Sequence, residues 1–300
     1  MKTWPWSRLR TATPRHLSAT RAPATVLRDH PVLLLAGPPS DAMVNRLLRA
    51  WNPSAELPDI AEGVRWSGPY RLDAVGATDA GLPLGWSTAY AAQTVRSRAR
   101  IPDGLGAIEL RERFPYGVPA GAEAVAWSLV TGLARRLDGS ARLPEPVEHR
   151  SRRAARNAAK STAAQRPRVH QNTYCVYGNE ALPWSVLRSL LALNLPELDR
   201  NGALAADDYC LDRADSFEVR VQPFRDGDFL PYALRPHAAS GWPCTVYRFR
   251  ALPQAKASDA KLIDVQLHGA AYQLAEIVGG VLLDGEGFPV ITELATQRQR

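Results

Sequence analysis

Apolar positions along this chain follow two spacings, one typical of buried strands and one of amphipathic helices. Val32 to Ala36 is a short apolar run that ends at a Gly-Pro-Pro turn, which predicts a buried strand. After the turn, apolar residues from Val44 to Trp51 recur three and four positions apart, and Ser40 is placed to cap the helix that this spacing predicts. The pattern therefore begins with a strand and an amphipathic helix.

The same succession returns in the second half of the chain. An apolar run over 174–177 ends at Gly178, and Leu187, Leu190 and Leu191 then recur at helical spacing. Both halves continue with segments that alternate apolar and polar residues, and each closes with an apolar helix that ends near a glycine. The predicted strands are 32–36, 70–74, 108–110 and 141–143 in the first half and 174–177, 217–221, 247–249 and 281–283 in the second; the predicted closing helices are 123–137 and 262–278.

In each half the predicted order is strand, helix, strand, strand, helix, strand, which is the split βαβ or ferredoxin-like plan. The sequence therefore predicts an α+β protein of two tandem ferredoxin-like βαββαβ units, each an antiparallel sheet with helices on one face. This pattern resembles that of uncharacterised two-lobed proteins of bacteria with GC-rich genomes; the resemblance implies a fold and no activity. The expected domains are a basic flexible tail over 1–30, units over 31–148 and 171–300, and a basic linker over 149–170.

The formal net charge of +7 is concentrated in two stretches that lack acidic residues. Residues 1–28 and 149–168 hold 13 of the 37 basic residues, which leaves 24 bases against 30 acids elsewhere. Both stretches are poor in aliphatic residues, so little apolar surface can offset the entropy of ordering them. They are candidates for weak, sequence-independent contacts with nucleic acid through its phosphates. The candidate residues are Arg8, Arg10, Arg150, Arg152, Arg153 and Arg156.

Composition argues against several classes of protein. No run of about 18 apolar residues predicts a membrane span, and the segment from Trp4 to Trp6 interrupts the apolar stretch that a signal peptide would need. The three cysteines are odd in number and lack CxxC spacing, so neither a disulfide framework nor a zinc knuckle is indicated. We therefore expect a cytoplasmic bacterial protein with reduced thiols.

The sequence lacks several common catalytic and phosphate-binding motifs. It contains no GxxxxGK[ST], HExxH or GxSxG, and its six histidines are dispersed. We therefore expect neither a cofactor nor a metal, and we favour a protein that is not an enzyme. The remaining catalytic hypothesis is a cluster of His268, Cys244 and loop acids between the halves. The ferredoxin-like strand order would also bring Cys175 towards Cys244 if both faced the same side.

The predicted binding surfaces are two long loops and the polar side of the strands. The loops over 76–104 and 223–243 are longer than hairpins need, and each contains Trp and Tyr. The strand arginines alternate with aromatic residues that we expect to point into the core, which argues against an RNA-binding sheet that displays its aromatics. The candidate residues for a ligand or partner surface are Trp86, Tyr90, Arg220, Tyr232, Trp242, Arg248 and Arg250.

Three functions remain open. The first is a non-enzymatic binding or scaffolding protein that receives a protein or small molecule in a cleft between the halves or on the long loops. The second is a nucleic-acid-associated protein that uses the basic tail and linker. The third is an enzyme with a pocket between the halves. The lack of a catalytic constellation favours the first.

Overall fold

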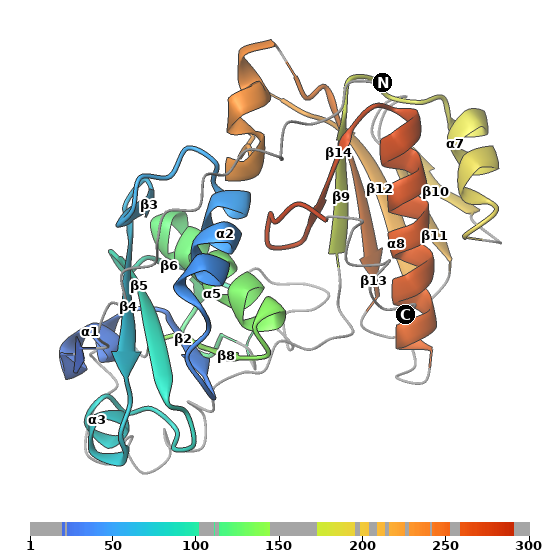
Figure 1. The fold of residues 1–300 in the computed structure, drawn as a ribbon. Coiled ribbons are helices and arrows are strands. Elements are labelled where there is room, and N and C mark those ends of the chain that lie inside the picture. Colours follow the sequence, from blue (N-terminus) through green and yellow to red (C-terminus); the bar gives the residue numbers. More distant parts are fainter. Residues whose placement is uncertain are drawn as a thin grey trace.

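The protein is a mixed α+β chain with two six-stranded sheets, built largely from antiparallel pairs. This computed structural model describes residues 20–21, 23–101, 111, 114–144, 173–195, 199–203, 209–213, 216–225, 228–240, 242–252 and 259–290. Each half of the chain forms one of these sheets and the helices that pack on it (Figure 1). The first half also contains a separate two-stranded sheet, in which Arg98–Ala99 pairs with Val118–Pro119. The coarse prediction of an α+β protein with antiparallel sheets is confirmed.

The first sheet has the order β1-β4-β5-β2-β8, with β3 also paired to β4. Within it only the short pairing of β1 with β4 is parallel. The elements are β1 (Thr20–Arg21), α1 (Ala24–Asp29), β2 (Val32–Leu35), α2 (Asp41–Trp51), β3 (Asp59–Ala61), β4 (Val64–Arg71), α3 (Ala74–Asp79), β5 (Thr88–Thr94), β6 (Arg98–Ala99), β7 (Val118–Pro119), α5 (Gly121–Arg136) and β8 (Ser140–Arg142).

Helices cover both faces of this first sheet. On β2, Leu33 and Leu35 pack with α2 and α5, whereas Val32 and Leu34 pack with α1 and α3 on the opposite side. All four are buried, which explains why β2 has an unbroken apolar sequence. Part of the segment predicted as a tail is therefore ordered: α1 lies on the sheet, and its Leu27 is buried.

The third strand of the first half differs from the prediction. Residues 108–110 lie outside the described part of the chain, and β5, inside the predicted loop 76–104, occupies the place between β2 and β4. The sequence of β5 hides its role because it is rich in alanine, a residue depleted in strands. Helices pack closely on both of its faces, and small side chains leave room for them.

The second sheet is wholly antiparallel and has the order β10-β11-β12-β13-β9-β14. Its hairpin β10–β11 was not predicted, because this segment is rich in polar and turn-forming residues and lacks an apolar run. The elements are β9 (Thr173–Gly178), α7 (Trp184–Leu191), β10 (Asp199–Ala203), β11 (Tyr209–Arg213), β12 (Phe217–Pro223), the 3₁₀ helix η2 (Tyr232–Ser240), β13 (Thr245–Ala251), α8 (Ala260–Ile277) and β14 (Val281–Asp284).

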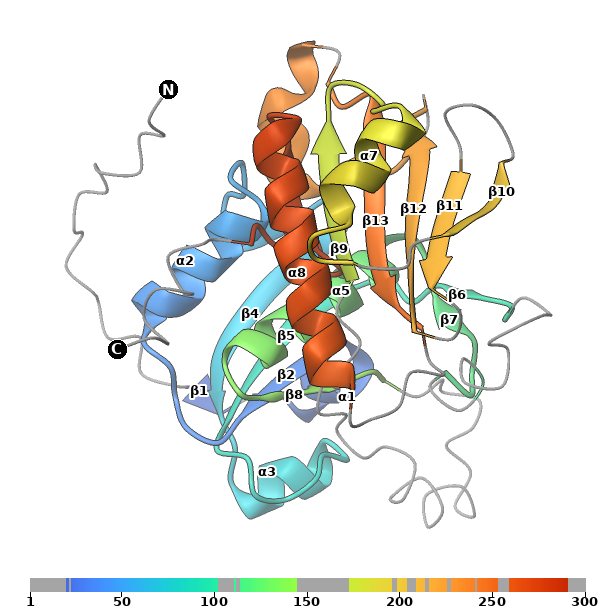
Figure 2. The ribbon, with the colours of Figure 1, turned by 90° about the vertical axis from the view of Figure 1, so that its right-hand side faces the viewer.

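The two α-helices of this half lie on the side of the second sheet that faces away from the first half. Figure 2 shows α7 and α8 in front of the second sheet and the first half behind it. Between the helices and the sheet lies a core of apolar residues that includes Leu187, Val219 and Leu274. On the opposite side, η2 contributes Ala233 and Leu234 to a smaller apolar cluster against β9 and β13.

Candidate binding face

Three arginines share the side of the second sheet that is opposite α7 and α8. Arg220 on β12 lies directly across from Arg248 on β13, and Arg250 follows two residues later on the same side. All three side chains are exposed. The aromatic residues that alternate with them, Phe217, Tyr247 and Phe249, are fully buried on the helix side, as predicted from the sequence. We call Arg220, Arg248 and Arg250 the arginine face.

The arginines differ in their neighbours. Arg250 forms an ion pair with Glu218, with 2.9 Å between Nη2 and Oε1. Arg220 lies directly across from Arg248 on the neighbouring antiparallel strand, where the Cα atoms of opposed residues are about 4.5–5.5 Å apart. Like charges in this position weaken strand pairing. The register therefore places two basic side chains side by side on the exposed side of the sheet.

The row of residues across the sheet at this level carries cysteines next to the arginines. Cys210 lies across from Arg220, and Cys175 lies across from Arg248. Burial raises the pKa of the Cys175 thiol, while the charge of Arg248 and its hydrogen bond to the sulfur act in the opposite direction. Burial likewise raises the pKa of the Tyr177 hydroxyl, and Arg248 again lowers it. The positive potential of Arg248 thus extends over the neighbouring strand.

An apolar border lies beside the arginine face. Tyr177 is two residues from Cys175 on β9, and it packs with Leu234 of η2 and with the half-buried Trp242. The Trp242 ring also meets His237 edge to face, with 5.8 Å between the ring centroids. A ligand on the arginines would therefore have aromatic and aliphatic side chains beside it.

The loop after β14 joins the two halves, as Figure 1 shows where it reaches α2 and α5. We call residues 285–288 the tongue. Its Phe288 is 1% exposed and belongs to the core of the first half. A Cβ atom at Gly132 of α5 would overlap Cε2 of Phe288 and lie 2.8 Å from Cδ2, so glycine is needed here for the close approach of the ring. The Arg136 guanidinium covers the ring at 4.0 Å from its centroid.

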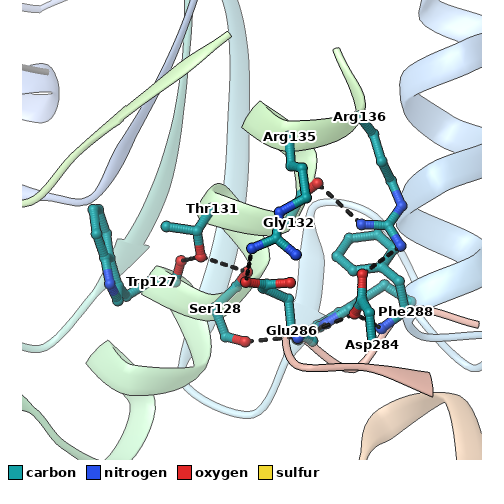
Figure 3. A network of polar contacts seen from close by, with 10 residues as sticks. Trp127, Ser128, Thr131, Gly132, Arg135, Arg136, Asp284, Glu286 and Phe288 are labelled. Atoms are coloured by element: carbon teal, nitrogen blue, oxygen red, sulfur yellow. Dashed lines mark hydrogen bonds and ion pairs between the residues drawn. The ribbon is translucent and has the colours of Figure 1, made fainter. Parts of the chain in front are cut away.

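Polar contacts hold the tongue on the first half (Figure 3). Glu286 pairs with Arg135 at 2.8 Å, and Asp284 pairs with Arg136 at 2.6 Å. The backbone carbonyl of Glu286 accepts a hydrogen bond from Trp51 Nε1 at 2.9 Å and another from Ser128 Oγ at 3.2 Å. These pairs are partly buried and charge-assisted, which favours a fixed geometry.

The turn of the tongue is itself organised by one carboxylate. Asp284 Oδ1 accepts hydrogen bonds from the backbone N–H groups of Glu286 and Phe288, at 3.0 and 2.9 Å. Gly287 has a φ of 83°, a conformation that glycine adopts readily. Tyr232 of η2 adds a further contact between the halves, because the centroid of its ring lies 4.9 Å from that of Trp51. Together these contacts form the junction between the halves.

The other predicted surface residues are dispersed. Tyr90 is buried in the core of the first half, stacked on Trp66 at 5.4 Å, and burial raises its pKa to about 12. Trp86 packs half-buried on the opposite side of that sheet, and Tyr232 lies in the junction. The structure thus groups the three arginines, with Trp242 beside the same face. The arginines predicted to contact polyanions, namely Arg8, Arg10, Arg150, Arg152, Arg153 and Arg156, lie outside the described residues.

The hypothetical catalytic cluster is not assembled. His268 on α8 stacks on Tyr174 with 5.3 Å between ring centroids, whereas the Cys244 backbone N–H donates to Gly178 at the other end of β9. Four residues of strand separate these positions, about 13 Å. Cys175 lies across from Arg248, and Arg248 is four residues from Cys244 along the chain. The register therefore does not bring these two cysteines together.

Within the described residues, no three side chains of His, Cys, Asp or Glu gather as a metal site would require. None of the described helices is both long enough and apolar enough to cross a membrane. No protein-family model matches the chain, and the search of curated proteins found no similar sequence. The arrangement of the side chains therefore carries the functional argument.

Proposed function

We propose that this protein is a non-enzymatic binding protein that receives an anionic partner on the arginine face. The observation that carries this proposal is the opposition of Arg220 and Arg248, both exposed, on neighbouring strands. Such a pair weakens the sheet by repulsion, and a bound anion relieves this repulsion.

Rigid support favours binding at this position. The arginines project from strands, whose backbone is held by pairing on both sides, and a site on strands keeps its geometry better than one on a loop. The junction fixes the tongue against α2 and α5 of the first half. We infer that the first half serves to hold the second half and its binding face in a fixed orientation.

We further propose that the halves are tandem ferredoxin-like units over 31–148 and 171–300. The shared strand orders β8-β2-β5-β4 and β14-β9-β13-β12 support this, as does the matching succession of helices. In this fold the helices pack on one face of the sheet. In the first half α1 and α3 cover the other face, whereas in the second η2 packs on one part of it and the arginines are exposed on another. This difference supports a binding function in the second half.

A charge-matched pair of variants tests the proposed function. Arg220→Gln with Arg248→Gln removes two charges from the arginine face, and Arg46→Gln with Arg49→Gln removes two from the exposed surface of α2. Both proteins keep the acid-free stretches, so general attraction to polyanions falls equally. We expect the first variant to elute from immobilised heparin at distinctly lower salt than the second. Equal elution by two folded variants would refute the proposal.

A second candidate function is weak, non-specific binding of nucleic acid through residues 1–28 and 149–168. The 13 bases in these stretches, without any acid, favour it. The test is an electrophoretic mobility shift with bulk DNA at low salt, using the full chain with the bases of both stretches replaced by glutamine. Loss of the shift is expected. A shift that persists unchanged in this variant excludes the stretches as the contact.

A further inference from the structure

Helix α8 carries apolar side chains on two of its sides. One side, which includes Ile263, Leu267 and Leu274, is buried against the second sheet. On the other side, Leu262 and Val265 are 62% and 61% exposed. Figure 2 shows α8 in front of the second sheet and the first half behind it, so the first half does not cover these side chains. A helix that packs on one sheet needs only one apolar side, and the second therefore suits a partner.

Exposed apolar side chains are concentrated around this part of α8. Single exposed apolar residues are normal on a protein surface, whereas a group of them indicates an interaction site. Leu193, directly after α7, adjoins α8 because the next residue, Asn194, donates a hydrogen bond from Nδ2 to Oε1 of Gln273 at 2.8 Å. Of the eleven large apolar side chains that are exposed in the described part of the chain, five lie on α7, on α8 or directly after α7: Val186, Leu193, Leu262, Val265 and Ile277.

The spacing on the outer side of α8 is that of a coiled-coil seam. The residues of this exposed stripe are separated by three, four, three and four positions: Leu262, Val265, Gly269, Tyr272 and Glu276. Two antiparallel copies fit together when Leu262 lies beside Tyr272 of the other copy, and Val265 beside Gly269. Glycine permits this close approach because it has no side chain. A two-fold axis near Leu267 generates all four contacts, so the exposed stripe is complementary to itself.

The two ends of the exposed stripe carry opposite charges. Lys261 and Glu276 are both exposed, and neither forms an ion pair with another described residue. In the two-fold arrangement, Lys261 of one copy and Glu276 of the other lie about 4.5 Å apart along the helix axes, which is the rise of three residues. The flexible stem of lysine spans this distance. A parallel arrangement would instead bring like charges together, so the charges favour an antiparallel contact between two copies.

We propose that the chain forms a homodimer in which the exposed stripes of two α8 helices pack antiparallel about a two-fold axis. A second copy is the partner because the exposed stripe is self-complementary in both its spacing and its charges. The contact is small, with one principal helix from each copy, so the dimer dissociates on dilution. The arginine face lies on the other side of the second sheet, and dimerisation therefore leaves it accessible in both copies.

Analytical ultracentrifugation of the full-length protein over a range of concentrations tests this inference. We expect monomers at low and dimers at high concentration. Leu262→Ser with Val265→Ser should raise the dissociation constant of the dimer about tenfold or more, because both copies lose apolar contacts. The control Val75→Ser with Leu84→Ser changes side chains of similar exposure, 59% and 67%, in the first half and should leave dimerisation unchanged. A wild-type monomer at every concentration would overturn the inference and leave the exposed stripe to a different protein, and equal effects of the two double variants would also overturn it.

An exchange of charges tests the antiparallel orientation. At low salt, Lys261→Glu and Glu276→Lys each place like charges together and should each raise the dissociation constant of the dimer about fivefold, the upper range for exposed ion pairs. The protein with both substitutions has the pair reversed and should dimerise within about twofold of the wild type, because the two changes compensate each other. Losses that simply add in this protein would exclude the antiparallel contact.

Discussion

A single methyl group at position 132 tests the structure of the junction. Gly132 lies inside α5, where alanine stabilises a helix by about 1 kcal/mol relative to glycine. Here, however, the new Cβ would overlap the ring of Phe288, which is 1% exposed and cannot move into solvent without leaving the core. Such overpacking costs about 1–3 kcal/mol. Because two ring atoms of Phe288 are involved, we take an overpacking cost of about 2–3 kcal/mol. After subtraction of the helix gain of about 1 kcal/mol, we expect Gly132→Ala to destabilise the protein by about 1–2 kcal/mol.

The sign of this effect should reverse when the ring is removed. Phe288→Ala alone is expected to cost about 3–5 kcal/mol, the usual loss when a buried phenylalanine is truncated. In that background the methyl group at position 132 has space, and only the helix preference remains, so Gly132→Ala should now stabilise by about 1 kcal/mol. The coupling energy between the two positions is then about 2–3 kcal/mol.

Urea unfolding followed by circular dichroism measures all four proteins of this cycle, with the slope checked for two-state behaviour. Gly269→Ala on α8 is a matched control, because its Cβ would meet only the end of the Asn194 side chain, at 3.2 Å. It should be neutral or stabilising. Two results would refute the reasoning: stabilisation by Gly132→Ala in the wild-type background, or the same change in stability with and without the Phe288 ring.

Three further predictions concern other parts of the chain. Glu123 and Arg98 form an ion pair at 2.8 Å, with side chains 0% and 16% exposed. Glu123→Gln breaks this pair and should lower the free energy of unfolding, measured in urea, by about 3–5 kcal/mol. A loss below about 1 kcal/mol would contradict this account. Burial lowers the pKa of His30 below 6.5, so the stability gained from its neutral form is present above that pH and lost below it as the unfolded chain takes up the proton. His30→Gln should therefore lose less stability than the wild type as the pH falls from about 7 to 5.5, and parallel pH curves would count against this explanation. The exposed Cys244 should react first with a thiol reagent in the native protein, and Cys175, which is buried and has a raised pKa, should react last; a rapid phase that survives Cys244→Ser would disprove the assignment.

Local sequence signals predicted about half of the helices and strands. The predicted strand 70–74 was largely wrong, because it shares only Tyr70 and Arg71 with β4, and Ala74 begins α3. Ser40 caps α2 as expected, its side chain accepting a hydrogen bond from the backbone N–H of Met43. The helical spacing of Leu187 and Leu191 identified α7, whose buried side they form. Such signals depend on neighbours within one turn or one strand. They fail for β5, an alanine-rich strand that is defined by the helices on its two sides.

The binding face could be predicted only in part. Alternation along β12 and β13 showed that Arg220, Arg248 and Arg250 lie on one side, opposite their buried aromatic neighbours. It did not show which arginine lies across from which, because register depends on pairing between strands. Nor did it show that Tyr90 is buried, since its strand was taken for a loop.

The junction gave the weakest signal in the sequence. The Gly-Glu-Gly-Phe segment at 285–288 has the composition of an ordinary turn after a strand. Its importance follows from what it meets: the glycine surface of α5, the indole of Trp51, and two arginines. All four of these groups are far from it in sequence, because Trp51, Gly132, Arg135 and Arg136 belong to the other half.

By itself, the sequence determined the α+β class, about half of the strands and helices, and the side of the strands on which the arginines lie, because side-chain periodicity and capping act over a few residues. Tertiary structure alone decided which charges oppose each other, which face of each sheet is covered, and how Phe288 joins the halves. These depend on strand register and on contacts between distant segments, and local patterns carry no information about either.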